Sequence, residues 1–276
     1  MAIMRILGGG ISGLIAAIQL KKSGLDVEVH EKKGFCGKKT NDFQFLENWT
    51  FEDDPLAFLR RIGIESDFYI KPKFSQEFLS PTLRKYEGRS AKPLMYLIKR
   101  GSSEDSIDQC LKEQAQRGGV TIKYHSNLRP EGADIIATGI KKPTFVTTGI
   151  KFRISHPETS IILLDNNISS RCYSYFIANE GVAEIVCANP SGTRNTAERL
   201  KEAVKRFEEI LSIRVKEVDE RFSSVVSFGF LHRAKIEGRY FVGEAAGFQD
   251  QLAGFGMAYA FRSGYLAARS IIEGLD

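Results

Sequence analysis

Three glycines and a glutamate near the start of the sequence have the spacing of a dinucleotide-binding loop. Gly8, Gly10 and Gly13 follow a short apolar run as Gly-x-Gly-x-x-Gly, and Glu31 ends a second run about 20 residues further on. Gly8 allows a tight turn, Gly10 lets the backbone approach a pyrophosphate, and Gly13 lets a helix pack on the strand before it. The amino end of that helix offers N–H groups to phosphates, while the Glu31 carboxylate can accept hydrogen bonds from a ribose. The cofactor-binding residues predicted here are Gly8, Gly10, Ile11, Ser12, Gly13, Glu31 and Lys32.

A second glycine-rich block, residues 243–256, points to a flavin. Glu244 follows a predicted buried strand, where a carboxylate can hold the hydroxyls of a ribityl chain. Gly254 and Gly256 let the backbone pass against a flat ring, and the helix predicted after them directs its positive end at the bound group. Reduced flavin carries negative charge near N1 and the C2 carbonyl, which this helix end would stabilise. The predicted binding residues are Gly243, Glu244, Gly254, Phe255, Gly256 and Met257; in the alternative interpretation, the glycines serve packing alone.

The elements that must position these residues alternate strand and helix at both ends of the chain. Periodicity and end signals predict helices after the Gly8 loop and after Asp53-Asp54-Pro55, and also at 103–117, 196–211 and 256–274. The strands predicted for the dinucleotide-binding part are 3–7, 26–30, 120–124, 133–139 and 239–243. Short strands separated by turn residues predict an antiparallel sheet from 152–156, 160–164, 172–178, 182–188, 213–218 and 223–230.

The fold class predicted from this order is α/β, a Rossmann-like FAD-binding domain with an inserted antiparallel-sheet substrate domain. The FAD-binding domain is predicted to comprise residues 1–70, 93–140 and 231–276. The substrate domain is predicted to comprise residues 71–92 and 141–230.

Composition narrows the function classes. The 276 residues are 42% hydrophobic and 26% charged, as in ordinary soluble globular proteins. Neither a membrane span nor a secretory signal is predicted, so we expect a cytoplasmic protein that is at most peripheral to a membrane. The net charge of +5 includes basic clusters that can attract an anionic cofactor, a phosphorylated substrate or an acidic membrane surface, or that form a solvated face. None interleaves with aromatic residues on a nucleic-acid module, so no nucleic-acid partner is predicted.

The cysteines and histidines predict neither disulfides nor a metal site. Cys36, Cys110, Cys172 and Cys187 lack CxxC spacing and any disulfide pattern. The four histidines form no HExxH or similar ligand set.

Several segments resemble the geranylgeranyl reductase family of two-dinucleotide-domain flavoproteins, which have a p-hydroxybenzoate hydroxylase-like fold. Residues 243–256 resemble its GDAAGx…LxGxG segment, and residues 96–119 its block of strand, arginine, helix and glycine. Residues 133–139 resemble its strand with an Ala-Thr-Gly or Ala-Asp-Gly turn, and residues 173–183 loosely resemble its YxWxFP…G substrate motif. The resemblance implies FAD, with Arg100 near its phosphates or adenine and the Leu128 backbone near the adenine. It also adds Ala137, Thr138 and Gly139 to the cofactor-binding residues.

The same resemblance implies an FAD-dependent oxidoreductase of the reductase type. In that chemistry, N5 of the reduced flavin delivers hydride to a carbon–carbon double bond of an apolar, isoprenoid-like substrate, which requires a dry and aligned site. The electron donor is expected to be NAD(P)H or a reduced protein. The partner is expected to be a small apolar or lipid-like substrate, with transient contact to a membrane surface. The oligomeric state is not predicted.

No catalytic residue stands out, and the candidates are Cys36, Tyr173 and Tyr175. Cys36 lies in the loop where the family's reductases often carry a cysteine, although early in it; the other interpretation is a partly buried loop thiol. The residues that could line an apolar pocket, or simply pack a core, are Tyr173, Tyr175, Phe176, Phe228 and Phe230.

Departures from the family pattern keep alternatives open. Glu244 replaces an Asp, and its longer side chain shifts the expected ribityl contact. Tyr175 replaces a Trp and Ala178 a Pro, which weakens the assignment of a lipid substrate. A flavin monooxygenase of the aromatic-hydroxylase type is one alternative, but residues 137–142 lack the Asp and Ser of its Ala-Asp-Gly-x-x-Ser segment. A non-catalytic FAD-binding protein is another. A nicotinamide dehydrogenase without flavin would leave residues 243–256 without a role.

Overall fold

The computed structural model describes residues 3–140, 142–227, 229, 231, 233–250 and 253–275. Internal contacts divide the chain into two compact units. Unit 1 comprises residues 1–72, 95–141 and 227–276, and unit 2 comprises residues 73–94 and 142–226. Each unit has a hydrophobic core of its own.

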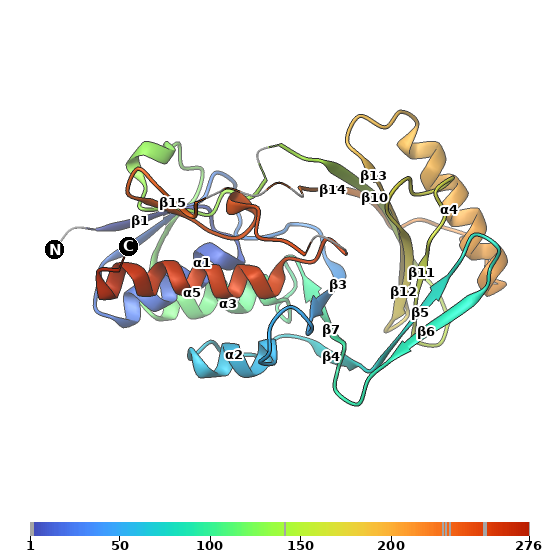
Figure 1. The fold of residues 1–276 in the computed structure, drawn as a ribbon, viewed down its shortest axis with the longest axis horizontal. Coiled ribbons are helices and arrows are strands. Elements are labelled where there is room, and N and C mark those ends of the chain that lie inside the picture. Colours follow the sequence, from blue (N-terminus) through green and yellow to red (C-terminus); the bar gives the residue numbers. More distant parts are fainter. Residues whose placement is uncertain are drawn as a thin grey trace. The chain divides into compact units, whose positions relative to one another are not determined.

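Unit 1 is built on a six-stranded sheet in the order β15-β16-β9-β1-β2-β8, and its strands are parallel except β15. The strands are β1 (Met4–Leu7), β2 (Val27–His30), β8 (Thr121–Lys123), β9 (Ile135–Ile136), β15 (Lys235–Ile236) and β16 (Arg239–Phe241). The helix α1 (Ile11–Lys22) packs against α3 (Ile107–Arg117) and α5 (Met257–Glu273), as Figure 1 shows. Apolar residues of α1, buried almost all round, fill the space between the sheet and the other two helices.

A second, three-stranded sheet of unit 1 has the order β3-β7-β4. Its strands are β3 (Asp42–Glu47), β4 (Ile70–Lys73) and β7 (Met95–Arg100), and β3 pairs antiparallel with β7. The helix α2 (Pro55–Arg61) begins as the sequence predicts, because the Asp54 carboxylate accepts hydrogen bonds from the first-turn N–H groups. Two short 3-10 turns, η1 (Pro130–Gly132) and η2 (Gly243–Ala246), follow β8 and β16.

Unit 2 is a seven-stranded sheet in the order β14-β10-β13-β12-β11-β5-β6. Its strands are β5 (Ser75–Leu79), β6 (Lys85–Arg89), β10 (Phe145–Arg153), β11 (Thr159–Leu163), β12 (Ser174–Asn179), β13 (Val182–Pro190) and β14 (Glu220–Val226). Only the β11–β5 pair is parallel among these described strands. The helix α4 (Thr196–Leu211) buries Leu200, Ala203 and Phe207 against one face.

The α/β fold class, with a Rossmann-like part and an additional antiparallel sheet, is confirmed. The predicted strand at 213–218 is wrong: Ile213, Val215 and Val218 pack against the core of unit 2, but the last strand begins at Glu220. The predicted helix start at residue 103 is also wrong, because the Ser106 hydroxyl caps a helix that begins at Ile107. None of the described helices has the length and apolar character of a membrane span.

Candidate functional site

The loop after β1 has the tight packing that its glycines predict. Gly8 has a φ of +112°, and a Cβ there would lie 2.3 Å from the Ala137 carbonyl oxygen. A Cβ on Gly13 would lie 2.1 Å from the Gly8 carbonyl oxygen, so α1 starts in direct backbone contact with the loop. Gly10 differs, because no atom lies within 4 Å of its Cβ position. The loop is therefore closed on its protein side and open at Gly10, the amino end of α1.

Glu31 holds this loop from the end of β2. Its Oε2 accepts a hydrogen bond from the Gly9 N–H and its Oε1 from the Lys33 N–H, each at 2.8 Å. A carboxylate has about four acceptor positions, so these two bonds leave capacity for ribose hydroxyls. Lys32, predicted beside Glu31, is exposed. The structure thus gives Glu31 a loop-ordering role that its spacing alone did not indicate.

The helices α1 and α5 run in the same direction, from the carboxyl edge of the sheet to its amino edge. The Met4 N–H, where β1 starts, bonds to the Asp26 carbonyl just beyond α1. The Tyr240 hydroxyl, near the start of β16, bonds to the Leu275 carbonyl just beyond α5. Their amino ends therefore point the same way.

The contact between α1 and α5 places their amino ends at different positions along their common direction. A Cβ on Gly264 would lie 2.3 Å from the carbonyl oxygen of Ser12, the second residue of α1. Since α5 begins at Met257, it extends about 10 Å beyond that contact at the rise of an α-helix. Neither helix has a side-chain cap from its own N-cap residue, Gly10 or Gly256. The site thus has two positive helix ends, offset along one direction.

Glu244 lies beside this pair of helices. It follows Gly243, whose N–H donates to the Ser263 hydroxyl at 2.9 Å and whose Cβ position is 2.8 Å from the Ser12 hydroxyl. A Cβ on Gly139 would lie 3.8 Å from Glu244 Oε2, so the two predicted segments meet here. Glu244 is accessible to solvent, yet surrounding protein raises the pKa of its carboxyl group by desolvation, which the charge of Arg100 partly offsets.

Arg100, predicted to approach the cofactor, is the centre of a polar network at the end of β7. Its Nε and Nη2 donate to the two carboxylate oxygens of Asp108 at 2.8 and 3.0 Å, and its Nη1 donates to Gln44 Oε1 at 3.2 Å. Its side chain is 15% exposed and that of Asp108 1%. Such bidentate pairing fixes the guanidinium in place. Asp108 and Gln44 are site residues that sequence reasoning missed, and Asp108 lies in the first turn of α3 only because this helix begins at Ile107 and not at residue 103.

The other predicted cofactor residues lie after β9, between β8 and η1, and around the start of α5. Ala137 is buried, Thr138 exposed, and the Ala137 N–H bonds to the Leu7 carbonyl at 2.7 Å. Leu128 packs against Leu7 and Ile136, and its N–H donates to Ser126. In the C-terminal block, Phe255 stacks edge-on with Trp49 at 5.3 Å and Met257 is buried. Gly254 (φ +75°) donates its N–H to the Asp250 carbonyl.

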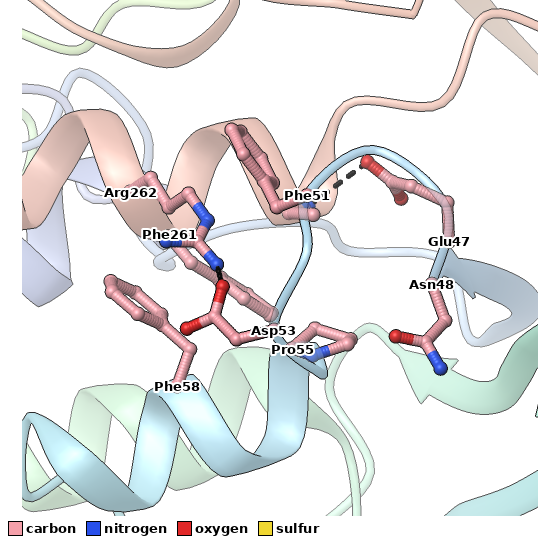
Figure 2. Close-up of a pocket in the computed structure, with 9 residues that line it drawn as sticks. Glu47, Asn48, Phe51, Asp53, Pro55, Phe58, Phe261 and Arg262 are labelled. Atoms are coloured by element: carbon pink, nitrogen blue, oxygen red, sulfur yellow. Dashed lines mark hydrogen bonds and ion pairs between the residues drawn. The ribbon is translucent and has the colours of Figure 1, made fainter.

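Glu47, at the end of β3, is a third residue that sequence reasoning missed. Its side chain is fully buried, and Oε1 accepts a hydrogen bond from the Ala258 N–H in the first turn of α5 at 3.1 Å. Figure 2 shows this bond and the neighbouring Arg262, which pairs with Asp53 and not with Glu47. Glu47 lines a pocket with Asn48, Phe51, Asp53, Pro55, Phe58, Ala258, Phe261 and Arg262.

The catalytic candidates fall in two different surroundings. Cys36 is 1% exposed beneath the Gly9 backbone, and burial raises the pKa of its thiol, which disfavours the reactive thiolate. In unit 2, Tyr173 and Tyr175 are half-buried neighbours with ring centroids 6.3 Å apart. Of the two roles predicted for Phe176, the structure shows core packing, because this residue is fully buried and its ring centroid lies 6.0 Å from that of Phe207. Phe228 and Phe230 lie outside the described residues.

Comparison with known proteins supports the architecture. Residues 6–62 match the family model of an NAD(P)-binding Rossmann-like domain. No curated protein is a significant match to the sequence. A geranylgeranyl bacteriochlorophyll reductase-like protein from Thermoplasma acidophilum is 19% identical, with a TM-score of 0.77 over 99% of this chain and 79% of that one.

Two further solved structures share the fold. The flavin-dependent brominase Bmp2 is 16% identical, with a TM-score of 0.73 over 99% of this chain and 79% of that one. A flavoprotein/dehydrogenase from Cytophaga hutchinsonii is 15% identical, with a TM-score of 0.69 over 100% of this chain and 80% of that one. At these identities the likeness shows the fold, and the fold is one that flavoproteins use.

Proposed function

We propose that this chain is an FAD-dependent oxidoreductase. The observation that carries the proposal is the pair of helix amino ends, at Gly10 and Gly256, which point the same way and are offset by about 10 Å. An extended dinucleotide with phosphates at one position and a ring system at the other matches this arrangement. A nicotinamide enzyme needs only the first of these two helix ends, the one that binds phosphates.

The residues present fit this cofactor. The open backbone at Gly10 and the first N–H groups of α1 would hold the pyrophosphate, and Glu31 the ribose. Glu244, accessible to solvent beside Gly139, would hold ribityl hydroxyls. The amino end of α5 would meet the pyrimidine edge of the ring. When bound, FAD supplies hydride transfer between an electron donor and a substrate.

The finer proposal is a reductase that saturates a carbon–carbon double bond of an apolar, isoprenoid-like substrate. The sheet of unit 2 supports it, since cross-strand pairing puts a row of side chains on the face opposite the α4 core. That row contains Ile162, Tyr175, Val186, Gly149 and Phe222. In this proposal the alkene chain lies along that row of mainly apolar side chains, which would keep it from water, as hydride transfer to an isolated alkene requires. NAD(P)H or a reduced protein is the proposed donor, and a lipid-like substrate implies transient membrane contact.

FAD binding is tested with the purified chain. The visible spectrum reports retained cofactor, and fluorescence of Trp49, the single tryptophan, reports added FAD because its ring contacts Phe255. Gly10→Ala fills the open position without a clash and should weaken FAD binding at least tenfold. Gly88→Ala, equally unobstructed but on the exposed β6, is the matched control. A colourless protein that takes up no FAD refutes the proposal.

The reductase step is tested separately, by reducing the FAD-loaded protein without oxygen and adding a soluble isoprenoid alcohol. Reoxidation of the flavin with formation of the saturated product supports the reductase. Reoxidation by oxygen alone, with no product from any alkene, contradicts it and leaves FAD binding intact.

A further inference from the structure

Glu47 is a buried acid that the proposed function leaves unused. Its side chain has no exposed surface, and its Oε1 accepts a hydrogen bond from the Ala258 N–H at 3.1 Å. Its Oε2 is buried with no hydrogen-bond partner. Because an ionised carboxylate can only accept hydrogen bonds, an unpartnered buried oxygen favours the neutral acid.

The charged groups around Glu47 reinforce this preference. On α5, Arg262 pairs with Asp53 and stacks 4.0 Å from the Phe51 ring. Glu47 belongs to none of the ion pairs found among the described residues. Asp250, in the loop before α5, has the same charge as Glu47. Burial, with a contribution from Asp250, raises the pKa of Glu47 to about 7, although hydrogen bonds from α5 oppose the shift.

The position of Glu47 ties its charge to the amino end of α5. An ionised Glu47 neutralises the positive end of the helix, whereas a protonated Glu47 leaves that end available to another anion. By linkage, an anion bound at this helix end must in turn favour protonation of Glu47. Reduced flavin is such an anion, and oxidised flavin is not.

We propose that Glu47 is a positioning residue that takes up a proton from solvent when the bound flavin is reduced. The inference rests on the proposed function, that FAD is the cofactor. A two-electron donor supplies a hydride equivalent, which the flavin receives, and a solvent proton bonds to a carboxylate oxygen of Glu47. All electrons go to the flavin, and Glu47 changes only its charge. The amino end of α5 then faces one negative charge and not two.

The experiment is a redox titration of FAD-loaded wild type, Glu47→Gln and Glu52→Gln over a pH series. Glutamine preserves the acceptor for the Ala258 N–H, and Glu52 is an exposed control. Above about pH 7, the wild type should take up one more proton than Glu47→Gln does. For each pH unit, the equilibrium constant for flavin reduction in the wild type should therefore change by a factor of ten more than it does in Glu47→Gln. For a two-electron couple this corresponds to about 30 mV of reduction potential per pH unit. The Glu52→Gln protein should follow the wild type.

If the reduction potential of the flavin depends on pH equally in wild type and Glu47→Gln, the inference is overturned. FAD binding is measured first and independently, so this result leaves the proposed function unaffected. If Glu47→Gln does not fold or load, the infrared difference spectrum of wild type on reduction at about pH 8 decides. A new carbonyl band of a protonated carboxylic acid supports the proposal, and its absence overturns it. A wild type that binds no FAD refutes the proposed function, and the inference falls with it.

Discussion

The contact between α1 and α5 should make Gly264 intolerant of a side chain. The ideal Cβ at this position lies 2.3 Å from the Ser12 carbonyl oxygen and 3.1 Å from the Ser12 carbonyl carbon. Both partners are backbone, so only a separation of the helices by about 1 Å relieves the overlap, and overpacking of this kind costs about 1–3 kcal/mol. Alanine also favours the helical state by about 1 kcal/mol over glycine. The two effects oppose each other, so we expect Gly264→Ala to lower the free energy of unfolding by up to about 2 kcal/mol.

Urea unfolding followed by Trp49 fluorescence measures this effect in the correct unit, because the single tryptophan belongs to unit 1. Gly264→Val should cost more than Gly264→Ala, since it adds volume at the same contact. Gly10→Ala should leave stability nearly unchanged, because its Cβ position is open. A Gly264→Val protein as stable as wild type would refute the reasoning and with it the offset derived from this contact.

Three further variants test the buried charges of unit 1. Because burial raises the pKa of Glu47 to about 7 in the folded protein, above its ordinary value of 4.5, the folded state binds more protons than the unfolded state between these pH values. The contribution of Glu47 to stability is therefore greatest below about pH 4.5 and falls by about 3 kcal/mol as the pH rises to about 7. Glu47→Gln should remove this slope in urea titrations over the same pH range, and an unchanged slope would contradict the burial argument. Asp108→Asn leaves the Arg100 guanidinium without its bidentate partner, so unfolding should become easier by about 2–4 kcal/mol. The double variant Arg100→Met/Asp108→Leu should recover part of that loss by the same assay, whereas a single variant of wild-type stability would show that the pair is dispensable.

The sequence by itself determined the local elements and the dinucleotide loop. Helix α4 spans residues 196–211, as its periodicity predicts, and Asp54 caps α2, because both depend on near neighbours. The Gly8–Gly13 pattern likewise reports contacts within the loop and with the strand ends beside it. The extended segment at 213–218 was not determined in this way: its apolar residues pack against a core without joining the sheet, and periodicity does not distinguish these outcomes.

Only the tertiary structure decided how the two halves of the site meet. The Ser12–Gly264 contact sets the offset of the two helix ends, and Glu47 bonds to Ala258 across 211 residues of sequence. Burial and backbone approach between distant segments leave no periodic signal, because they depend on how whole helices pack on a sheet. The residues that could bind a dinucleotide were therefore readable from spacing, whereas the buried acid at the α5 amino end became visible only when the chain was folded.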